Sequence, residues 1–193
     1  MPTPSFFQNY VQVVAAVQIC LEKKLQMPAL ILIYTLMDTF AWAVYGADER
    51  SSRKRFEAWT RKWVLSHAEL SCTAADLYAA RCAVLHTMTS EASLTESGEA
   101  RRIAYAWGTA TAEKLQSVVS ALGHENIVGV HIENLFGAVR EAMARVVERS
   151  DQDSRLRKRL EQAASKHFAS MEDEKVEEFL SRVHGSKGGR SEV

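Results

Sequence analysis

Proline is scarce in this sequence: there are three prolines in 193 residues, and none lies beyond Pro28. A proline inside a helix removes a hydrogen bond and clashes with the preceding turn, so the rest of the chain lacks the strongest helix breaker. Pro4 and Pro28 each stand where a first-turn proline would. With 47% apolar residues, the chain has enough material for one core of ordinary size. We therefore predict one mainly α-helical domain with extensions.

The sequence also has no excess of charge of either sign. Its 24 basic and 24 acidic residues give a formal net charge of zero. No overall field attracts the protein to nucleic acid or to an anionic membrane, so any RNA contact must come from local basic patches. A glycine-rich phosphate loop, a serine-hydrolase elbow and a metalloprotease motif are likewise missing from the sequence.

Cysteines are few, and a targeting segment is not evident. Cys20, Cys72 and Cys82 form an odd set without paired spacing, and the first ten residues lack the basic start and apolar stretch of a secretory signal. We predict reduced thiols and a cytoplasmic location. The apolar run 29–45 is shorter than the roughly 20 residues that a membrane span needs. A buried central helix, without membrane association, is the better interpretation.

Helical periodicity is the main pattern that the sequence does contain. Apolar residues recur at three- and four-residue spacing, as on the buried face of a helix. This spacing and the stop signals predict helices over 4–24, 28–45 and 133–149, and a further helix after Ser52. Strand-like alternation at 103–107 and 128–132 predicts a small β pair. Phe56, Trp59 and Trp63 share one helix face and are predicted to be core residues rather than a stacking platform.

A further helix is marked by a capping signal. Thr73 and Asp76 have the spacing of a capping box, so this helix should begin near Ala74. It carries Arg81 and His86. The following segment, 88–99, is rich in Ser, Thr and Glu and is predicted to be a surface loop.

The C-terminal part differs in composition from the rest. Ser150 and Asp151 mark a break, which gives a bundle at 1–150 and a charged helical extension at 151–184. Residues 185–193 contain little that could be buried and are predicted to be disordered. The extension is a candidate binding surface for a protein partner.

The segment from Leu77 to His86, LYAARCAVLH, follows two long apolar helices and resembles the signature of the HEPN superfamily: an Arg, four to six residues, then a His. The resemblance covers mainly residues 6–149. It implies a four- or five-helix bundle in which two copies meet as a homodimer and form a metal-independent ribonuclease site. Arg81 and His86 would then be catalytic, no cofactor would be needed, and the partner would be RNA.

These two residue types suit RNA cleavage. The reaction needs a base for the 2′-hydroxyl and a cation for the charge on the phosphorane. Five residues at 100° each place Arg81 and His86 about 140° apart on an ideal helix, so we expect convergence only near a helix end or across a two-fold axis. Asp38, the lone charge in its helix, is predicted to pair with Arg81, and His131 is a second supporting candidate.

Several alternatives remain open from the sequence. Arg61 and His67 also fit the looser motif spacing. Zinc ligation by Cys82 and His86, with His67 and Cys72 upstream, is a weaker alternative because structural zinc sites have tighter cysteine pairs. Lys62, Arg101 and Arg102 are candidate phosphate contacts.

Two positions depart from the HEPN pattern, in which many ribonucleases have a polar residue after the Arg and a nucleotidylated subset has Tyr two residues after the His. Here these positions are Cys82 and Met88. The alternative function is therefore a non-catalytic helical module that binds another protein, with Arg81 and His86 in structural roles.

Overall fold

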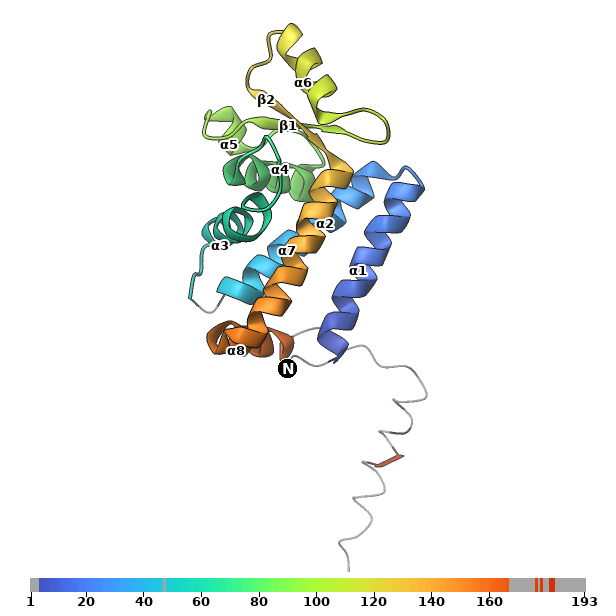
Figure 1. Ribbon diagram of the computed structural model, residues 1–193, viewed down its shortest axis with the longest axis vertical. Coiled ribbons are helices and arrows are strands. Elements are labelled where there is room, and N and C mark those ends of the chain that lie inside the picture. Colours follow the sequence, from blue (N-terminus) through green and yellow to red (C-terminus); the bar gives the residue numbers. More distant parts are fainter. Residues whose placement is uncertain (1–3, 47, 167–175, 177, 179–180, 183–193) are drawn as a thin grey trace, which may run out of the picture.

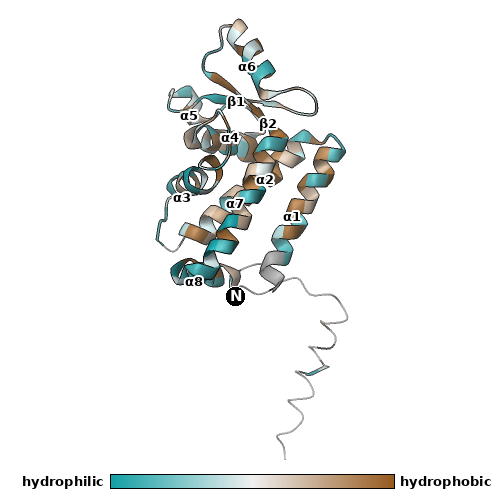
Figure 2. Ribbon diagram, in the orientation of Figure 1, coloured by the Kyte–Doolittle hydropathy of each residue, from teal (hydrophilic) through white to brown (hydrophobic). Residues whose placement is uncertain are grey.

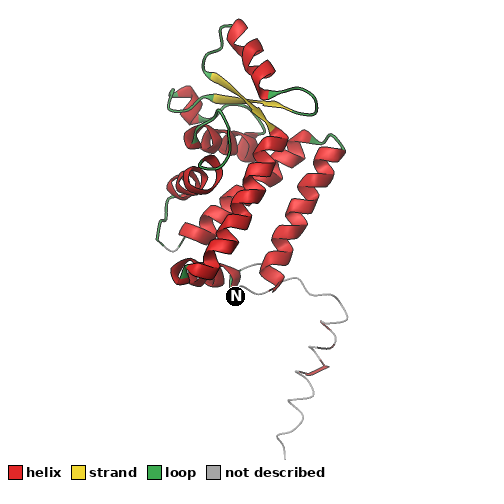
Figure 3. Ribbon diagram, viewed as in Figure 1, coloured by secondary structure: helices red, strands yellow, loops and turns green. Residues whose placement is uncertain are grey.

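The computed structural model describes residues 4–46, 48–166, 176, 178 and 181–182. Over these residues the protein is mainly α-helical with a small two-stranded parallel sheet, as predicted (Figures 1 and 3). The elements are α1 (Pro4–Glu22), α2 (Gln26–Tyr45), α3 (Ser52–Trp59), η1 (Thr60–Leu65), α4 (Ala74–Thr87), α5 (Ser93–Glu96), β1 (Arg102–Ala106), α6 (Ala112–Ala121), β2 (Ile127–His131), α7 (Ile132–Gln152) and α8 (Ser154–Ala164).

The most apolar helix, α2, lies at the centre of the bundle. It contacts α1, α3, α4, α7 and α8, and its buried side chains include Ile33, Tyr34, Met37 and Phe40. By length and composition α2 is the one described helix that could cross a membrane, but 56% of its most apolar window is buried inside the protein. This placement favours a core helix. The cytoplasmic location stays a prediction.

The aromatic helix face predicted for the core is buried. Phe56 and Trp59 are fully buried, and Trp63 is nearly so. After Trp59 the chain continues through the wider turns of the π-helix η1, which packs against α7. Arg145 of α7 donates a hydrogen bond of 3.2 Å to the main-chain oxygen of Trp63. These contacts make α3 and η1 one wall of the bundle.

The strands and α6 form a β-α-β unit at one end of the molecule (Figures 1 and 3). The strands are parallel, with Ala104 opposite Gly129. A Cβ at Gly129 would lie 2.8 Å from the main-chain oxygen of Ala112, so glycine is required for α6 to approach this closely. Val128 and Val130 join the core of the bundle. The sequence predicted the strand pair but missed the crossover helix.

The predicted domain boundary at 150 is wrong in detail. Helix α7 continues to Gln152, and Asp153 caps α8 by accepting hydrogen bonds from the main-chain N–H groups of Arg155 and Leu156. In Figure 2 the visible face of α8 is hydrophilic, but its Leu156 and Leu160 are buried and α8 packs on α2 and α7. The first part of the predicted extension therefore belongs to the core. The tail at 185–193 lies outside the described residues.

The predicted loop at 88–99 also contains structure, the single turn α5.

Candidate active site at the end of helix α4

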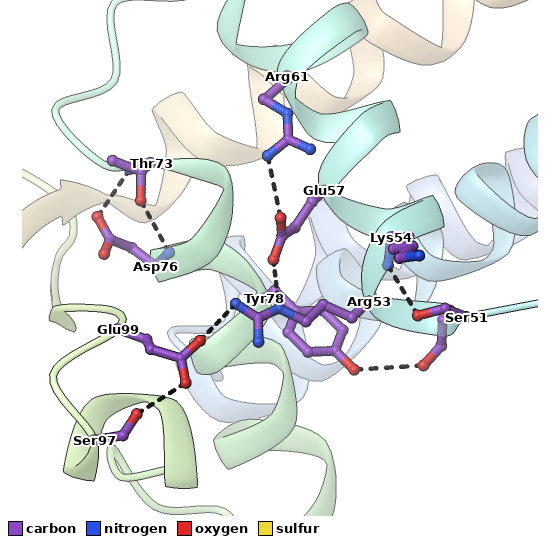
Figure 4. A network of polar contacts seen from close by, with 11 residues as sticks. Ser51, Arg53, Lys54, Glu57, Arg61, Thr73, Asp76, Tyr78, Ser97 and Glu99 are labelled. Atoms are coloured by element: carbon purple, nitrogen blue, oxygen red, sulfur yellow. Dashed lines mark hydrogen bonds and ion pairs between the residues drawn. The ribbon is translucent and has the colours of Figure 1, made fainter. Parts of the chain in front are cut away.

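The N-terminal end of α4 is fixed by a saturated polar cluster. Thr73 and Asp76 form the predicted capping box, with bonds of 2.9 and 3.1 Å (Figure 4). Asp76 also accepts hydrogen bonds from the main-chain and side-chain nitrogens of Arg101, the shortest at 2.7 Å. Burial opposes the charge of Asp76, but these hydrogen bonds and the charge of Arg101 outweigh it, so its pKa is lowered. The cluster ties α4 to the start of β1.

The C-terminal end of α4 has a different character. Met88 ends the helix in the left-handed conformation, with φ of 53°, and its N–H bonds to the main-chain oxygen of Ala83. Such a cap usually carries glycine because a Cβ is unfavourable there. His86, two residues earlier, is exposed. A histidine is therefore held at the protein surface, beside the negative end of the helix dipole.

Arg81 links this histidine to the central helix. One of its terminal nitrogens lies 2.5 Å from an Asp38 carboxylate oxygen, and the other lies 3.3 Å from Nε2 of His86. The predicted pair of Asp38 and Arg81 is thus confirmed. Of the two arrangements expected to bring Arg81 and His86 together, the structure shows the one near a helix end: α4 ends at Thr87, and the long arginine side chain spans the angle to His86.

The guanidinium of Arg81 fixes the direction of the hydrogen bond to His86 and the tautomer of the imidazole. Arginine has donors only, so in this hydrogen bond Nε2 of His86 must accept and its proton must be on Nδ1. Burial disfavours the charge of Arg81, yet the hydrogen bond and charge of Asp38 prevail and raise its pKa. Nε of Arg81 is buried without a hydrogen-bond partner among the described residues. Asp38 therefore fixes the position of the Arg81 guanidinium, but one nitrogen of that group still lacks a hydrogen-bond partner among the described residues.

A mostly apolar pocket of about 230 Å³ lies beside this end of α4. It is lined by Val84 of α4, by the segment Met88 to Ser90 that follows His86, by Met27 of α2 and by Tyr105 of β1. The hydroxyl of Tyr105 forms a short hydrogen bond with that of Tyr34, which ties β1 to α2. Tyr105 was recognised in the sequence only as a strand residue, because no local pattern indicates a partner 71 positions away.

The alternative pair is not brought together. Arg61 forms an ion pair with Glu57 at 3.1 Å, and Glu57 also binds Arg53 (Figure 4). His67 lies beyond the end of η1 and is exposed. Within the part of the chain that the structure describes, no hydrogen bond or ion pair joins Arg61 to His67. Arg61 belongs instead to the surface network that links α3 to Glu99.

The remaining basic candidates are mostly engaged elsewhere. Arg101 binds Asp76 and the main-chain oxygen of Ser71, and Arg102 pairs with Glu91 at 2.8 Å. Lys62 is exposed and lies over the ring of Trp63, 5.0 Å from its centroid. Arg101 thus joins the start of β1 to the N-terminal end of α4, whereas Lys62 is exposed to solvent.

His131, the second supporting candidate, caps α7 at the end of β2. It is 9% exposed, and its Nε2 lies 3.2 Å from the main-chain oxygen of Gly108. No hydrogen bond connects it to Asp38, Arg81 or His86 in the described segments. The structure therefore places His131 in the β-α-β unit and gives it no contact with the predicted pair.

The zinc alternative requires a cluster of metal-ligating side chains around Cys82 and His86. Among described residues, no group of three or more His, Cys, Asp or Glu side chains could hold a metal ion. Cys72 is buried, which raises the pKa of its thiol to about 12 and keeps it protonated. Cys82 lies with its sulfur 3.9 Å from the Arg81 guanidinium. These positions account for Cys72 and Cys82 without an ion.

Comparisons with family models, with curated proteins and with solved structures found no match to this chain. The geometry around α4 and the resemblance of its motif are therefore the features that indicate a function.

Proposed function

We propose that the protein is a HEPN-like, metal-independent endoribonuclease or toxin-type RNA-binding protein that acts as a homodimer. The observation that carries the proposal is the chain of contacts from Asp38 through Arg81 to His86. A partly buried carboxylate orients a guanidinium, and the guanidinium holds the accepting nitrogen of a surface imidazole. These are the groups that transesterification of RNA requires, in mutual contact.

The reaction follows from the chemistry of the two side chains. When RNA binds, Arg81 turns from Nε2 of His86 to the phosphate. The freed Nε2 takes the proton of a 2′-hydroxyl, and the 2′-oxygen forms a bond to the adjacent phosphorus. The bond from phosphorus to the 5′-oxygen breaks, and that oxygen takes a proton from an acid or from water. Arg81 stabilises the negative charge that develops on the phosphoryl oxygens. The products are a 2′,3′-cyclic phosphate and a 5′-hydroxyl, and no metal is required.

Exposed apolar side chains beside His86 support the proposed pairing of two copies. Met88 is 65% exposed and Met27 is 39% exposed, and both line the pocket next to the site. Leu25, in the turn before α2, is also exposed. Contact between two copies would cover this surface and would bring a second His86 and Arg81 to the scissile phosphate. The second histidine could then supply the proton to the leaving 5′-oxygen.

The test measures cleavage of single-stranded RNA in excess EDTA. We expect products that end in 2′,3′-cyclic phosphate and no cleavage of DNA, which lacks the 2′-hydroxyl. Arg81→Ala or His86→Ala should lower the rate by a factor on the order of 10² or more, with an unchanged circular dichroism spectrum. Arg61→Ala and His67→Ala are the matched controls and should retain activity.

Two results would contradict the proposal in different ways. A strict monomer at micromolar concentration by light scattering would exclude the shared site. A wild-type protein inactive on every RNA tried would favour the alternative, a non-catalytic helical module that binds a protein partner. In that case the contacts of Arg81 would serve only to join α4 to α2.

A further inference from the structure

We propose that the β-α-β unit carries a nucleobase-stacking subsite, in which Trp107 stacks on an unpaired base and Lys114 contacts the adjoining phosphate. This inference rests on the proposed function because it supplies a second contact for the same RNA strand. Its test is arranged so that the two can fail separately.

Trp107 is far more exposed to solvent than the core tryptophans Trp59 and Trp63. Trp59 is fully buried and Trp63 is 8% exposed, whereas Trp107 is 50% exposed. Half of a large apolar ring in water is unfavourable, at roughly 25 cal/mol per Å² of apolar surface. Trp107 is also absent from the core cluster. The first residue after β1 is therefore a large aromatic ring without a structural role in the core.

The surroundings of Trp107 form a concave apolar site with one cation. A pocket of about 420 Å³ is lined by Trp107, by Ala110, and by Lys114, Leu115 and Val118 of α6. Lys114 forms no ion pair with any described residue, in contrast to Arg101 and Arg102. Stacking on an aromatic ring beside a basic side chain is the usual way in which proteins bind single strands without reading their sequence.

The pocket shares one lining residue with the pocket at the C-terminal end of α4. Tyr105 lines both this pocket and the one next to His86. The wall of the latter includes Thr89 and Ser90, which directly follow the α4 cap. In the proposed arrangement, an RNA strand with a phosphate at Arg81 runs along the segment after α4 and past Tyr105 to Trp107.

Charge complementarity favours a nucleotide over an apolar protein surface at this site. An apolar partner that covered Trp107 would also bury Lys114 without a counter-charge, which is costly. A nucleotide offers a flat ring for the indole and an anion for the ammonium. The half-exposed ring and the unpaired cation thus match two parts of one ligand.

The experiment measures binding of a fluorescein-labelled oligoadenylate of about 12 nucleotides by fluorescence anisotropy in EDTA. The full chain carries His86→Ala so that the probe is not cut. In this background Trp107→Ala should raise Kd about 5-fold or more, the usual effect of losing one stacked base. Trp107→Phe should lose less, and Trp107→Leu should behave like Ala. Lys114→Gln should reduce the slope of log Kd against log salt by about 0.7.

Leu122→Ala is the matched control, since Leu122 is 66% exposed just after α6 and does not line the pocket. It should leave Kd unchanged. An unchanged Kd for Trp107→Ala, with RNA still bound and cut by the wild type, would overturn the subsite and leave the proposed function standing. Loss of dimer mass in Trp107→Ala at unchanged RNA affinity would show that a second copy covers this face. If wild type neither binds nor cuts RNA, both proposals fail.

Discussion

The two ends of helix α4 each hold an aspartate and an arginine from distant parts of the chain, but they use them differently. At the N-terminal end, Asp76 has a side chain only 3% exposed and binds Thr73 and Arg101 through several hydrogen bonds. At the C-terminal end, Asp38 is 30% exposed and binds the guanidinium of Arg81.

The two ends of α4 differ as a structural ion pair differs from a candidate site. A saturated carboxylate has no capacity left for a ligand, and its removal leaves several buried donors unsatisfied. The C-terminal end keeps an unpartnered Arg81 nitrogen, an exposed His86 and a cap residue in an unfavourable conformation. A binding site without its ligand needs polar groups that still lack hydrogen-bond partners, placed next to a pocket.

The comparison is tested most strongly by Asp76→Ala and Asp38→Ala. Loss of Asp76 removes a cap and a buried charged partner, so we expect the free energy of unfolding to fall by about 2–3 kcal/mol. Loss of Asp38 should lower it by only about 1 kcal/mol but should reduce RNA cleavage about 10-fold or more, because Arg81 is no longer oriented. Urea denaturation and initial rates measure both. A larger stability loss for Asp38→Ala would reverse the assignment of the two ends.

Acid should affect the N-terminal end in a defined direction. The folded state lowers the pKa of Asp76, so its contribution is complete above the unfolded value near 3.9 and is lost as pH falls through the folded pKa. Asp76→Asn should therefore be less stable than wild type by about 1–2 kcal/mol at pH 7, and the gap should shrink below pH 4.

Urea titrations at several pH values measure this gap. Thr73→Ala is the control, because it loses about 1 kcal/mol of capping without removing a titrating group, and its deficit should not depend on pH in this way. A gap for Asp76→Asn that stayed constant down to pH 3 would show that the charge of Asp76 contributes little.

The smallest effect concerns the cap at the C-terminal end. A left-handed residue with a Cβ costs about 1–2 kcal/mol, and glycine costs about 0.5–1 kcal/mol in unfolded-state entropy. Met88→Gly should therefore raise the free energy of unfolding by about 0.5 kcal/mol. Met88→Ala keeps the Cβ and should give no gain in the same urea experiment. Equal stabilities for the Gly and Ala variants would show that this end of α4 carries no backbone strain.

Elements with local causes could be predicted from the sequence. The scarcity of proline and the apolar spacing predicted the long helices, and Thr73 with Asp76 predicted the start of α4 at Ala74. Asp38 could be matched to Arg81 because a lone charge in an apolar helix needs a partner. Helix α6 was missed because its apolar stripe is short, with Val119 its only buried side chain.

Which of the two Arg and His pairs meets depends on packing between helices. Both pairs fit the motif, with His67 six positions after Arg61 and His86 five positions after Arg81. However, Glu57 engages Arg61 one turn away, whereas Asp38 of another helix engages Arg81. Only packing could also show that α8 belongs to the core, that Arg101 completes the Asp76 cluster, and that Tyr105 joins two pockets. Periodicity reports which face of a helix is apolar, but partners far apart in sequence are fixed only when the whole chain packs.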